Sequence, residues 1–157
     1  MSEPTPIESF IDRIASGEIE LPTLGKTLGM EFGTFGEGTA TFTLNADPDR
    51  HGNVMGTLHG GVLAAVADTA MGFAFATTLA VGETFATLEI KVSFLRPVWR
   101  ATLTAAGHVL HRGKTTGLVE CRVTDERDRL VVHATSTCLV LRDEQAQGRK
   151  LGDRQPG

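Results

Sequence analysis

A long run of small and apolar residues, Asn53–Ala80, constrains the fold of this chain more than any other segment. From Gly61 to Ala80 it predicts a single helix of about five to six turns. Side chains on every side of this helix are apolar or small, with one charge at Asp68. A helix of this kind is either enclosed by protein or inserted in a membrane.

The membrane alternative is the weaker of the two. Asp68, Gly72 and Thr77 suit a lipid environment poorly, and neither Lys nor Arg flanks the helix. We therefore expect no membrane partner and a central helix that is enclosed by a β-sheet. A carboxylate costs free energy in apolar surroundings, so Asp68 is expected to have either a bonding partner or a chemical use.

The overall composition argues against several classes of protein. A length of 157 residues suits one domain with its own core. The formal net charge of -4 argues against a nucleic-acid-binding surface, which requires a basic field. Cys121 and Cys138 show no CxxC spacing and no signal peptide is evident, so we expect buried thiols in a cytoplasmic protein.

Six segments have the composition of β-strands. The clearest is Thr84–Leu95, where Leu88, Ile90 and Phe94 alternate with polar residues. Strands with one apolar and one polar face fit an antiparallel sheet that is covered on one side. The other five segments are Thr27–Phe35, Thr39–Leu44, Ala101–Leu110, Thr116–Thr124 and Leu130–Leu141.

The beginning of the chain predicts a short amphipathic helix. Thr5 and Glu8 have the spacing of a capping box around Pro6, and Gly17 ends the helix. One face of this helix is apolar and is expected to dock on the domain; it consists of Ile7, Phe10, Ile11 and Ile14. A connector is expected at Leu21–Leu24, where Pro22 interrupts regular structure.

The expected elements divide the chain into three parts. Residues 1–24 hold the short helix and connector, 25–142 form the main domain, and 143–157 form a polar tail that is expected to be disordered. Within the main domain, two strands, the long helix and four strands follow one another. This order predicts an α+β fold in which a curved antiparallel sheet wraps around the central helix. The loop Asn45–His59 leads into that helix, and loops of this length are often functional.

The motif His59-Gly60-Gly61 opens the long helix. Unpaired N–H groups at a helix start can hold a carbonyl oxygen that gathers negative charge, as an oxyanion hole does. The alternative is that the two glycines only permit a tight turn. His59 is better suited to holding this turn than to acting as a base. The five His residues show no metal-ligand spacing, so we expect no metal.

Gly60 and Asp68 are too far apart on one helix to act on the same atom. Eight residues separate them, which corresponds to about 12 Å along the axis. Two antiparallel copies of the helix, related by a two-fold axis, would bring Gly60 of one chain to Asp68 of the other. A shared site therefore requires a dimer with two composite sites.

Three groups of residues give this chain a family resemblance. Asn53, the segment Gly56–Gly61 and the segment Ala67–Ala70 together resemble the signature of hotdog-fold acyl-CoA thioesterases of the phenylacetate-degradation (PaaI-like) type. The strand Thr87–Phe94 with its Leu-Arg-Pro-Val continuation is similar to that family, as is Gly107–Glu120. The resemblance spans roughly residues 27–141.

The resemblance implies a role for each residue of the signature. Asp68 would be the catalytic carboxylate, which either attacks the thioester or activates a water. The Gly60 N–H would polarise the thioester carbonyl, and Asn53 would orient the carbonyl or the water. Thr87 matches a position where relatives carry a hydroxyl. Because alternation places Thr87 on the face away from Leu88, we expect it to reach the site only near the partner chain.

The expected substrate is an acyl-CoA, hydrolysed without a metal or redox cofactor by a homodimer, or by a homotetramer built as a dimer of dimers. His59 and Gly61 are expected to contact it at the turn. Cations for the coenzyme A phosphates are expected at Arg96, Arg112 and Lys114. The acyl pocket is expected between the central helix and the partner's sheet. Its expected lining, which suits medium-chain or aromatic acyl groups, is Met55, Val62, Met71 and Phe73.

Two other functions of the same fold stay open. A hotdog dehydratase pairs a loop His with an acid on the helix, as His59 and Asp68 could. The proline-rich motif around the dehydratase His is missing here, however, and the acid lies at a different spacing. A non-catalytic acyl-CoA sensor would carry a DNA-binding extension, and residues 1–24 are too short and too acidic to supply one.

Overall fold

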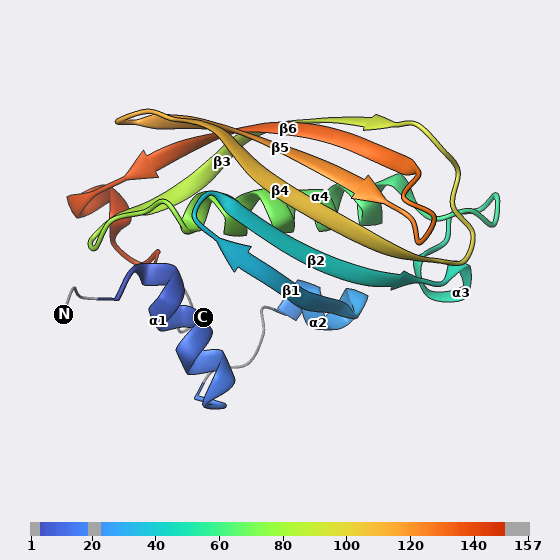
Figure 1. The fold of residues 1–157 in the computed structure, drawn as a ribbon, viewed down its shortest axis with the longest axis horizontal. Helices are drawn as coiled ribbons and strands as arrows, with labels where there is room; N and C mark the ends of the chain where they lie inside the picture. Colours follow the sequence, from blue (N-terminus) through green and yellow to red (C-terminus); the bar gives the residue numbers. More distant parts are fainter. Residues whose placement is uncertain (1–3, 19–22, 150–157) are drawn as a thin grey trace.

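The computed structural model describes residues 4–18 and 23–149. Its six-stranded antiparallel sheet has the order β1-β2-β4-β5-β6-β3 and curves around the helix α4 (Figure 1). The strands are β1 (Met30–Gly36), β2 (Thr39–Ala46), β3 (Thr84–Phe94), β4 (Ala101–Arg112), β5 (Thr116–Thr124) and β6 (Leu130–Leu141). The helices are α1 (Pro6–Ala15), α2 (Thr23–Leu28), α3 (Pro48–His51), α4 (Gly60–Ala76) and the 3-10 turn η1 (Asp143–Ala146). The predicted α+β architecture is confirmed.

Helix α4 is the centre of the core, and it is shorter than the sequence pattern predicts. It ends at Ala76 rather than Ala80. The hydroxyls of Thr77 and Thr78 donate to the carbonyls of Ala74 and Phe75 at 2.7 Å, so side chains satisfy the last turn where the helix stops. No helix of the described residues is long and apolar enough to cross a bilayer.

Two glycines let the sheet approach α4 closely. A Cβ at Gly107 would lie 2.3 Å from the carbonyl oxygen of Ala70, and a Cβ at Gly117 would lie 2.2 Å from the ring of Phe75. Any larger residue at either position would push the sheet off the helix. The side of α4 that these glycines contact is fully buried; it includes Val66, Ala67, Ala70, Met71, Ala74 and Phe75.

Strand β3 is an edge strand with a β-bulge that the alternating pattern does not reveal. Thr87 pairs with Cys138 and Glu89 pairs with Thr137, so Leu88 is the extra residue between them. The inward and outward faces exchange at this bulge. Thr87 therefore faces α4, on the same side of the sheet as Ile90, whereas simple alternation placed these two residues on opposite sides.

Several predicted boundaries need correction. The predicted strand Thr27–Phe35 is wrong at its start, because α2 continues to Leu28 and Gly29 then reverses the chain at φ +74°. The predicted loop Asn45–His59 contains the last residues of β2 and the short helix α3. Residues 21 and 22 of the predicted connector, and 150–157 of the predicted tail, lie outside the described residues.

The beginning of the chain and the thiols agree with the sequence. The Thr5 backbone N–H donates to Glu8 Oε2 at 2.8 Å and the Glu8 N–H donates to Thr5 Oγ1 at 3.4 Å, which confirms the predicted capping box. Ile7 and Phe10 of α1 are buried. Cys121 and Cys138 are free and buried, and burial raises the pKa of the Cys121 thiol to about 12.

Candidate active site

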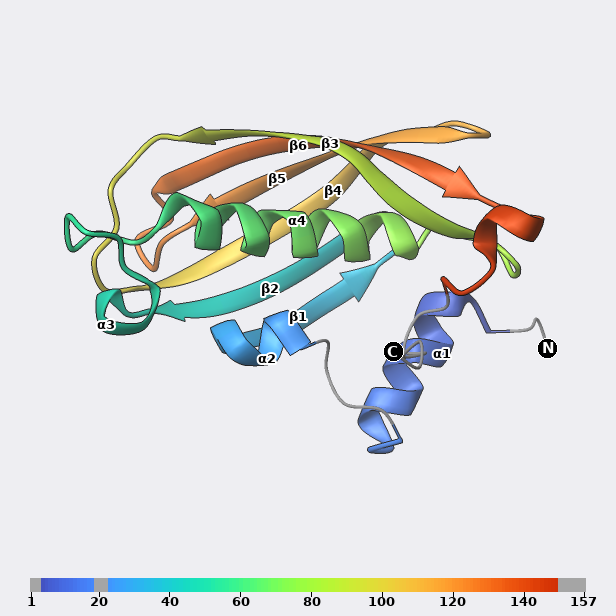
Figure 2. The same ribbon diagram turned by 180° about the vertical axis from the view of Figure 1, so that it is seen from behind.

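Figure 2 shows α4 in front of the sheet. Asp68 is on α4, opposite Thr87 of the edge strand β3. It is exposed in the single chain, but the protein around its carboxyl still removes water from it. This desolvation raises the pKa of Asp68, and a hydrogen bond from Thr87 partly opposes the effect. Thr87 Oγ1 donates to Asp68 Oδ1 at 3.4 Å across the gap between β3 and α4.

The contact between Thr87 and Asp68 depends on the bulge at Leu88. Without the extra residue, Thr87 would point away from the helix. The expectation that Thr87 reaches the site only near a partner chain is therefore wrong, because it contacts Asp68 of its own chain. Behind it, Cys138 and Ser136 of β6 are buried, with Ser136 Oγ 3.9 Å from Cys138 Sγ.

Asp68 borders a cavity of about 290 Å³ between α4 and the strands β1, β2 and β3. Polar groups gather at one part of its wall, where Asp68, Thr69 and Thr87 lie. The rest of the wall is apolar and largely aromatic, made of Leu24, Gly25, Met30, Phe32, Phe42, Gly72, Phe73, Ala76 and Phe85. The rings of Phe42 and Phe73 lie 5.0 Å apart, so the aromatic side is tightly packed.

Of the four residues expected to line the acyl pocket, Phe73 lines this cavity, and Met55, Val62 and Met71 do not. Met71 is fully buried on the side of α4 that faces the sheet. Val62 is half-buried near the helix start, and Met55 is 79% exposed at a loop tip. Helical spacing accounts for this result, because Phe73 follows Thr69 by one turn whereas Met71 points to the opposite side.

A second hollow joins Asp68 to the start of α4. This groove of about 420 Å³ runs between α4 and β3. Its helix side is formed by small residues, and its strand side includes two exposed apolar side chains; the lining is Gly61, Ala64, Ala65, Asp68, Thr87, Leu88, Glu89 and Ile90. In the single chain this groove is open to solvent.

The start of α4 leaves one N–H group without an acceptor. His59 is the N-cap, and its Nδ1 accepts from the Gly61 N–H at 2.8 Å. Its carbonyl accepts from Val62 and Leu63 at 3.0 and 3.3 Å. The Gly60 N–H donates to no acceptor in the described part of the chain. His59 thus holds the turn and accepts the hydrogen bond of the Gly61 N–H. The Gly60 N–H is therefore the donor that a ligand can use.

Asn53 closes the loop that precedes α4. Its Oδ1 accepts from the backbone N–H groups of Met55 and Thr57 at 2.9 and 3.3 Å. Its Nδ2 donates to Thr57 Oγ1 at 3.0 Å. Because an amide nitrogen carries two hydrogens, one remains for a ligand. Asn53 therefore organises this loop first and has a single donor left.

The sequence comparisons identify the family. A thioesterase superfamily model matches residues 55–132. A 1,4-dihydroxy-2-naphthoyl-CoA hydrolase from Listeria monocytogenes is 30% identical over 117 residues, which cover 74% of this chain and 94% of that protein. The chain belongs to the thioesterase superfamily. The acyl-coenzyme A thioesterase PaaI of Escherichia coli is 33% identical to this thioesterase over 107 residues, 68% of this chain and 74% of that one.

Solved structures of relatives share the fold of this thioesterase. A thioesterase from Haemophilus influenzae superposes with a TM-score of 0.75 at 26% identity, covering 90% of this chain and 93% of that one. The PaaI protein of Escherichia coli gives a TM-score of 0.74 at 26% identity, covering 88% and 97%. The predicted hotdog fold and the predicted resemblance to PaaI-like thioesterases are confirmed.

The three cations expected to bind coenzyme A differ in their surroundings in this thioesterase. Arg112 Nη2 pairs with Glu83 at 2.8 Å, and its guanidinium lies 5.3 Å from the ring centre of Phe75. Its side chain is only 22% exposed. Arg112 therefore serves the fold rather than an open phosphate site, contrary to our expectation. Arg96 and Lys114 are exposed.

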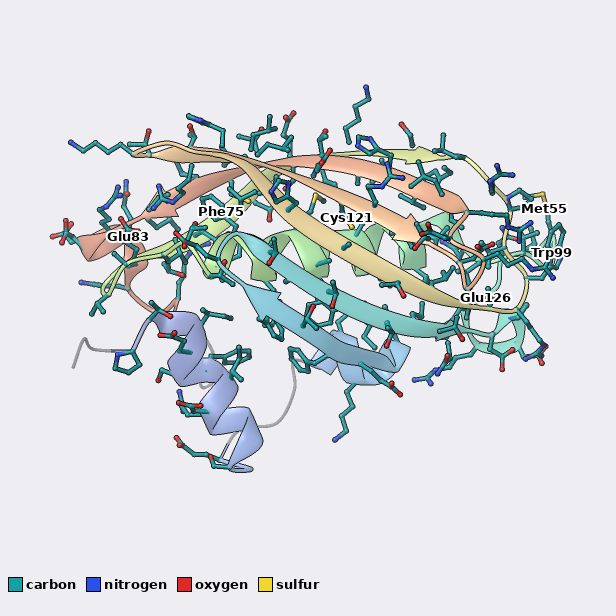
Figure 3. The ribbon with its side chains drawn as sticks, in the orientation of Figure 1. Met55, Phe75, Glu83, Trp99, Cys121 and Glu126 are labelled. Atoms are coloured by element: carbon teal, nitrogen blue, oxygen red, sulfur yellow. The ribbon has the colours of Figure 1, made fainter. Side chains whose placement is uncertain are left out.

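Arg96 shares a surface cavity of about 300 Å³ with Trp99 in this thioesterase, formed by the segment between β3 and β4 and the turn between β5 and β6. The Leu58 N–H donates to the Val98 carbonyl at 2.7 Å, and the Phe94 ring would lie 3.1 Å from a Cβ at Gly60. Figure 3 shows Trp99 and Met55 at the same end of the molecule, far from Glu83. The segment between β3 and β4, which holds Arg96, thus contacts the loop before α4, whereas Lys114 precedes β5 in the turn after β4.

Sequence reasoning missed the contribution of α2 to the cavity. Leu24 and Gly25 form part of the wall, yet the segment was expected to be connector and strand. No periodic signal marks a helix of six residues, because it is too short to show a face. Cys138 and Ser136, behind Thr87, could have been found only from the register of β3 against β6.

Proposed function

We propose that this chain hydrolyses an acyl-CoA with a medium-chain or aromatic acyl group to the free acid and coenzyme A, at two composite sites of a homodimer. The single observation that carries the proposal is a carboxyl with a raised pKa, Asp68, at the polar edge of an otherwise apolar cavity. The membership of the thioesterase superfamily supports the same chemistry.

Asp68 acts on the thioester in one of two ways. As a general base it accepts a proton from water, whose oxygen attacks the thioester carbonyl carbon. As a nucleophile it attacks that carbon itself and forms an anhydride that water then opens. In both routes the carbon–sulfur bond breaks, the sulfur leaves as thiolate and takes up a proton, and Asp68 returns to its starting state.

The Gly60 N–H of the partner chain polarises the thioester carbonyl. An N–H at a helix start that lacks an acceptor is suited to an oxygen on which negative charge develops. In one chain this group lies about 12 Å along the helix from Asp68. The remaining amide hydrogen of Asn53 orients the carbonyl or the attacking water.

Three features support a dimer that joins the two groups. Strand β3 is an edge strand and can pair with a second β3. Leu88 and Ile90 of that strand are apolar and are 58% and 37% exposed in the single chain, so a second β3 can bury them. The small residues Gly61, Ala64 and Ala65 line the open groove beside α4, so a second helix can approach closely.

The cavity favours a flat or unbranched acyl group of moderate size. Four Phe rings contribute to its wall, and a volume of about 290 Å³ is at the small end of ligand sites. The Listeria monocytogenes relative is a hydrolase of 1,4-dihydroxy-2-naphthoyl-CoA, a bicyclic aromatic thioester. Arg96 neutralises a coenzyme A phosphate outside the cavity. Lys114 is at the Glu83 end of the chain, because Arg142 bonds both Glu83 and the Lys114 carbonyl, and is not assigned to the same coenzyme A.

The test is the release of free coenzyme A from a panel of acyl-CoA thioesters, followed with a thiol reagent. The Asp68→Asn variant is expected to lower kcat by about 10²-fold or more, because it can neither accept the proton nor attack. Asp12→Asn makes the same change at an exposed position of α1 and is expected to have no effect on kcat.

The possible outcomes separate the three functions. Full turnover by the Asp68→Asn variant contradicts the proposed role of this carboxylate. Tight acyl-CoA binding without turnover by the unmodified protein indicates a non-catalytic sensor. Addition of water to an enoyl-CoA, with the thioester left intact, indicates a hydratase.

A further inference from the structure

One wall of the cavity beside Asp68 comes from outside the part of the chain that matches the family model. Leu24 and Gly25 of α2 line the cavity, whereas the match covers residues 55–132. Resting on the proposed function, we propose that α2 sets the size of the acyl group that the site accepts, and that Arg50 and His51 of α3 fix α2 in place.

The opposite walls of the cavity leave little freedom to adjust. Phe42 is buried, and its ring lies 5.0 Å from those of both Phe32 and Phe73. These rings pack against one another and against the core. Leu24 differs from them, because it is 55% exposed while it borders the cavity. The position of α2 therefore decides how much room an acyl group finds on this side.

Two side chains of α3 hold the carboxyl end of α2. Arg50 Nη2 donates to the carbonyl oxygen of Thr27 and, at 3.4 Å, to that of Lys26. The ring nitrogen Nε2 of His51 bonds to the Leu28 carbonyl at 2.9 Å. The last carbonyls of a helix have no partner within it, and a cation there also stabilises the helix dipole. A six-residue helix is too short to be stable alone, so these contacts determine where α2 lies.

The residues that hold α2 are themselves fixed. His51 is 3% exposed, and its Nδ1 accepts from the Asp47 N–H at 3.1 Å, which assigns the ring proton to Nε2 and makes His51 the donor to Leu28. Arg100 pairs with Asp47 at 2.8 Å and with Asp49 at 2.7 Å. Helix α3 is thereby joined to the start of β4.

Gly25→Leu tests the wall directly. No atom lies within 4 Å of a Cβ placed on Gly25, and its φ is not in the left-handed region, so the backbone accepts a side chain there. The new side chain narrows the cavity. Relative to wild type, we expect an affinity loss of about tenfold or more for S-decyl-CoA and a change of less than about twofold for S-ethyl-CoA. These thioethers cannot be hydrolysed, so calorimetry measures binding independently of turnover.

Two further variants distinguish an effect of the cavity wall on affinity from a general disturbance of α2. Lys26→Leu places the same side chain at the next residue, which does not line the cavity, and is expected to leave the preference unchanged. Arg50→Ala frees the end of α2 and is expected to reduce the ratio of the two affinities by at least about threefold. Hydrogen exchange of α2 amides in Arg50→Ala is expected to rise as well.

The outcomes for the wall and for hydrolysis are independent. An unchanged affinity ratio in Gly25→Leu, or the same change in Lys26→Leu, overturns the role of α2 even where acyl-CoA turnover is normal. Size-selective binding that Gly25→Leu alters, in a protein that releases no coenzyme A, supports the role of α2 and overturns the proposed hydrolysis. If neither thioether binds to the wild type, both the role of α2 and the proposed function are overturned.

Discussion

Asp68 combines an energetic cost with a chemical use at a single position. Partial removal of water raises its pKa above the ordinary value of 3.8. Above the raised pKa, the folded chain therefore carries a carboxylate that would be better solvated when unfolded, and this destabilises the fold. Below about pH 3.8 the group is protonated in both states and the cost disappears. A residue kept at such a cost is more readily explained by function than by stability.

The Asp68→Asn variant is expected to be more stable than the wild type at neutral pH, because the neutral amide avoids the desolvation of a charge. The difference in Tm is expected to shrink as the pH falls through the raised pKa and to vanish below about pH 3.8. Thermal unfolding of both proteins from pH 3 to pH 8 measures it. A lower Tm for Asp68→Asn at neutral pH would contradict the sign of the shift.

The hydroxyl of Thr87 stabilises the charged form of Asp68 and so lowers its pKa. Thr87→Val keeps the shape of the side chain and removes this donor. The pKa of Asp68 is then expected to rise further, and the acidic limb of kcat/KM to move to higher pH. A pH profile of the variant whose acidic limb coincides with that of wild type would exclude this role for Thr87.

At the scale of elements, α4 could be predicted from the sequence, whereas the bulge of β3 and the helix α2 could not. Its apolar composition on all sides predicted a central helix enclosed by a sheet, and Asp68 and Gly60 stood out from it. The bulge at Leu88 could not be predicted, because no glycine or proline marks it and its position depends on pairing with β6. Helix α2 could not be predicted either, since contacts from Arg50 and His51, distant in sequence, stabilise it.

The cap at the start of α4 gives a test at this scale. His59→Ala removes the acceptor of the Gly61 N–H and is expected to cost about 1 kcal/mol of stability. His59→Asn supplies another good capping side chain and is expected to restore most of it. Urea unfolding of the three proteins compares them. Equal midpoints for His59→Ala and the wild type would show that the cap contributes nothing to stability.

At the scale of the whole molecule, one chain holds all the expected catalytic groups but does not bring them together. Asp68 and Thr87 meet within the chain, whereas Gly60 opens the same helix about 12 Å away. This separation could be predicted from the sequence, because the two positions of the motif are eight residues apart. The lining of the cavity could not be predicted in this way. Met71 and Phe73 lie on different sides of α4, and only the packing of the sheet determines which side borders the cavity.

The most direct test mixes two inactive chains. Asp68→Asn removes the carboxylate, and Gly60→Pro removes the N–H at the first helical position, where the backbone suits proline. The new Cβ would lie 3.1 Å from the ring of Phe94, which is 53% exposed and can move by the few tenths of an ångström required. The backbone of His59, at φ -68° and ψ 131°, already suits a following proline. The two chains are purified, each is assayed alone, and they are then unfolded and refolded together.

If each site combines Asp68 of one chain with Gly60 of its partner, every mixed dimer contains one intact site and one with both defects. Random mixing then restores about a quarter of the wild-type acyl-CoA hydrolysis from two chains that are inactive alone. If the two groups act within one chain, every site retains a defect. Verified mixed dimers that release no more coenzyme A than either variant alone would contradict the account.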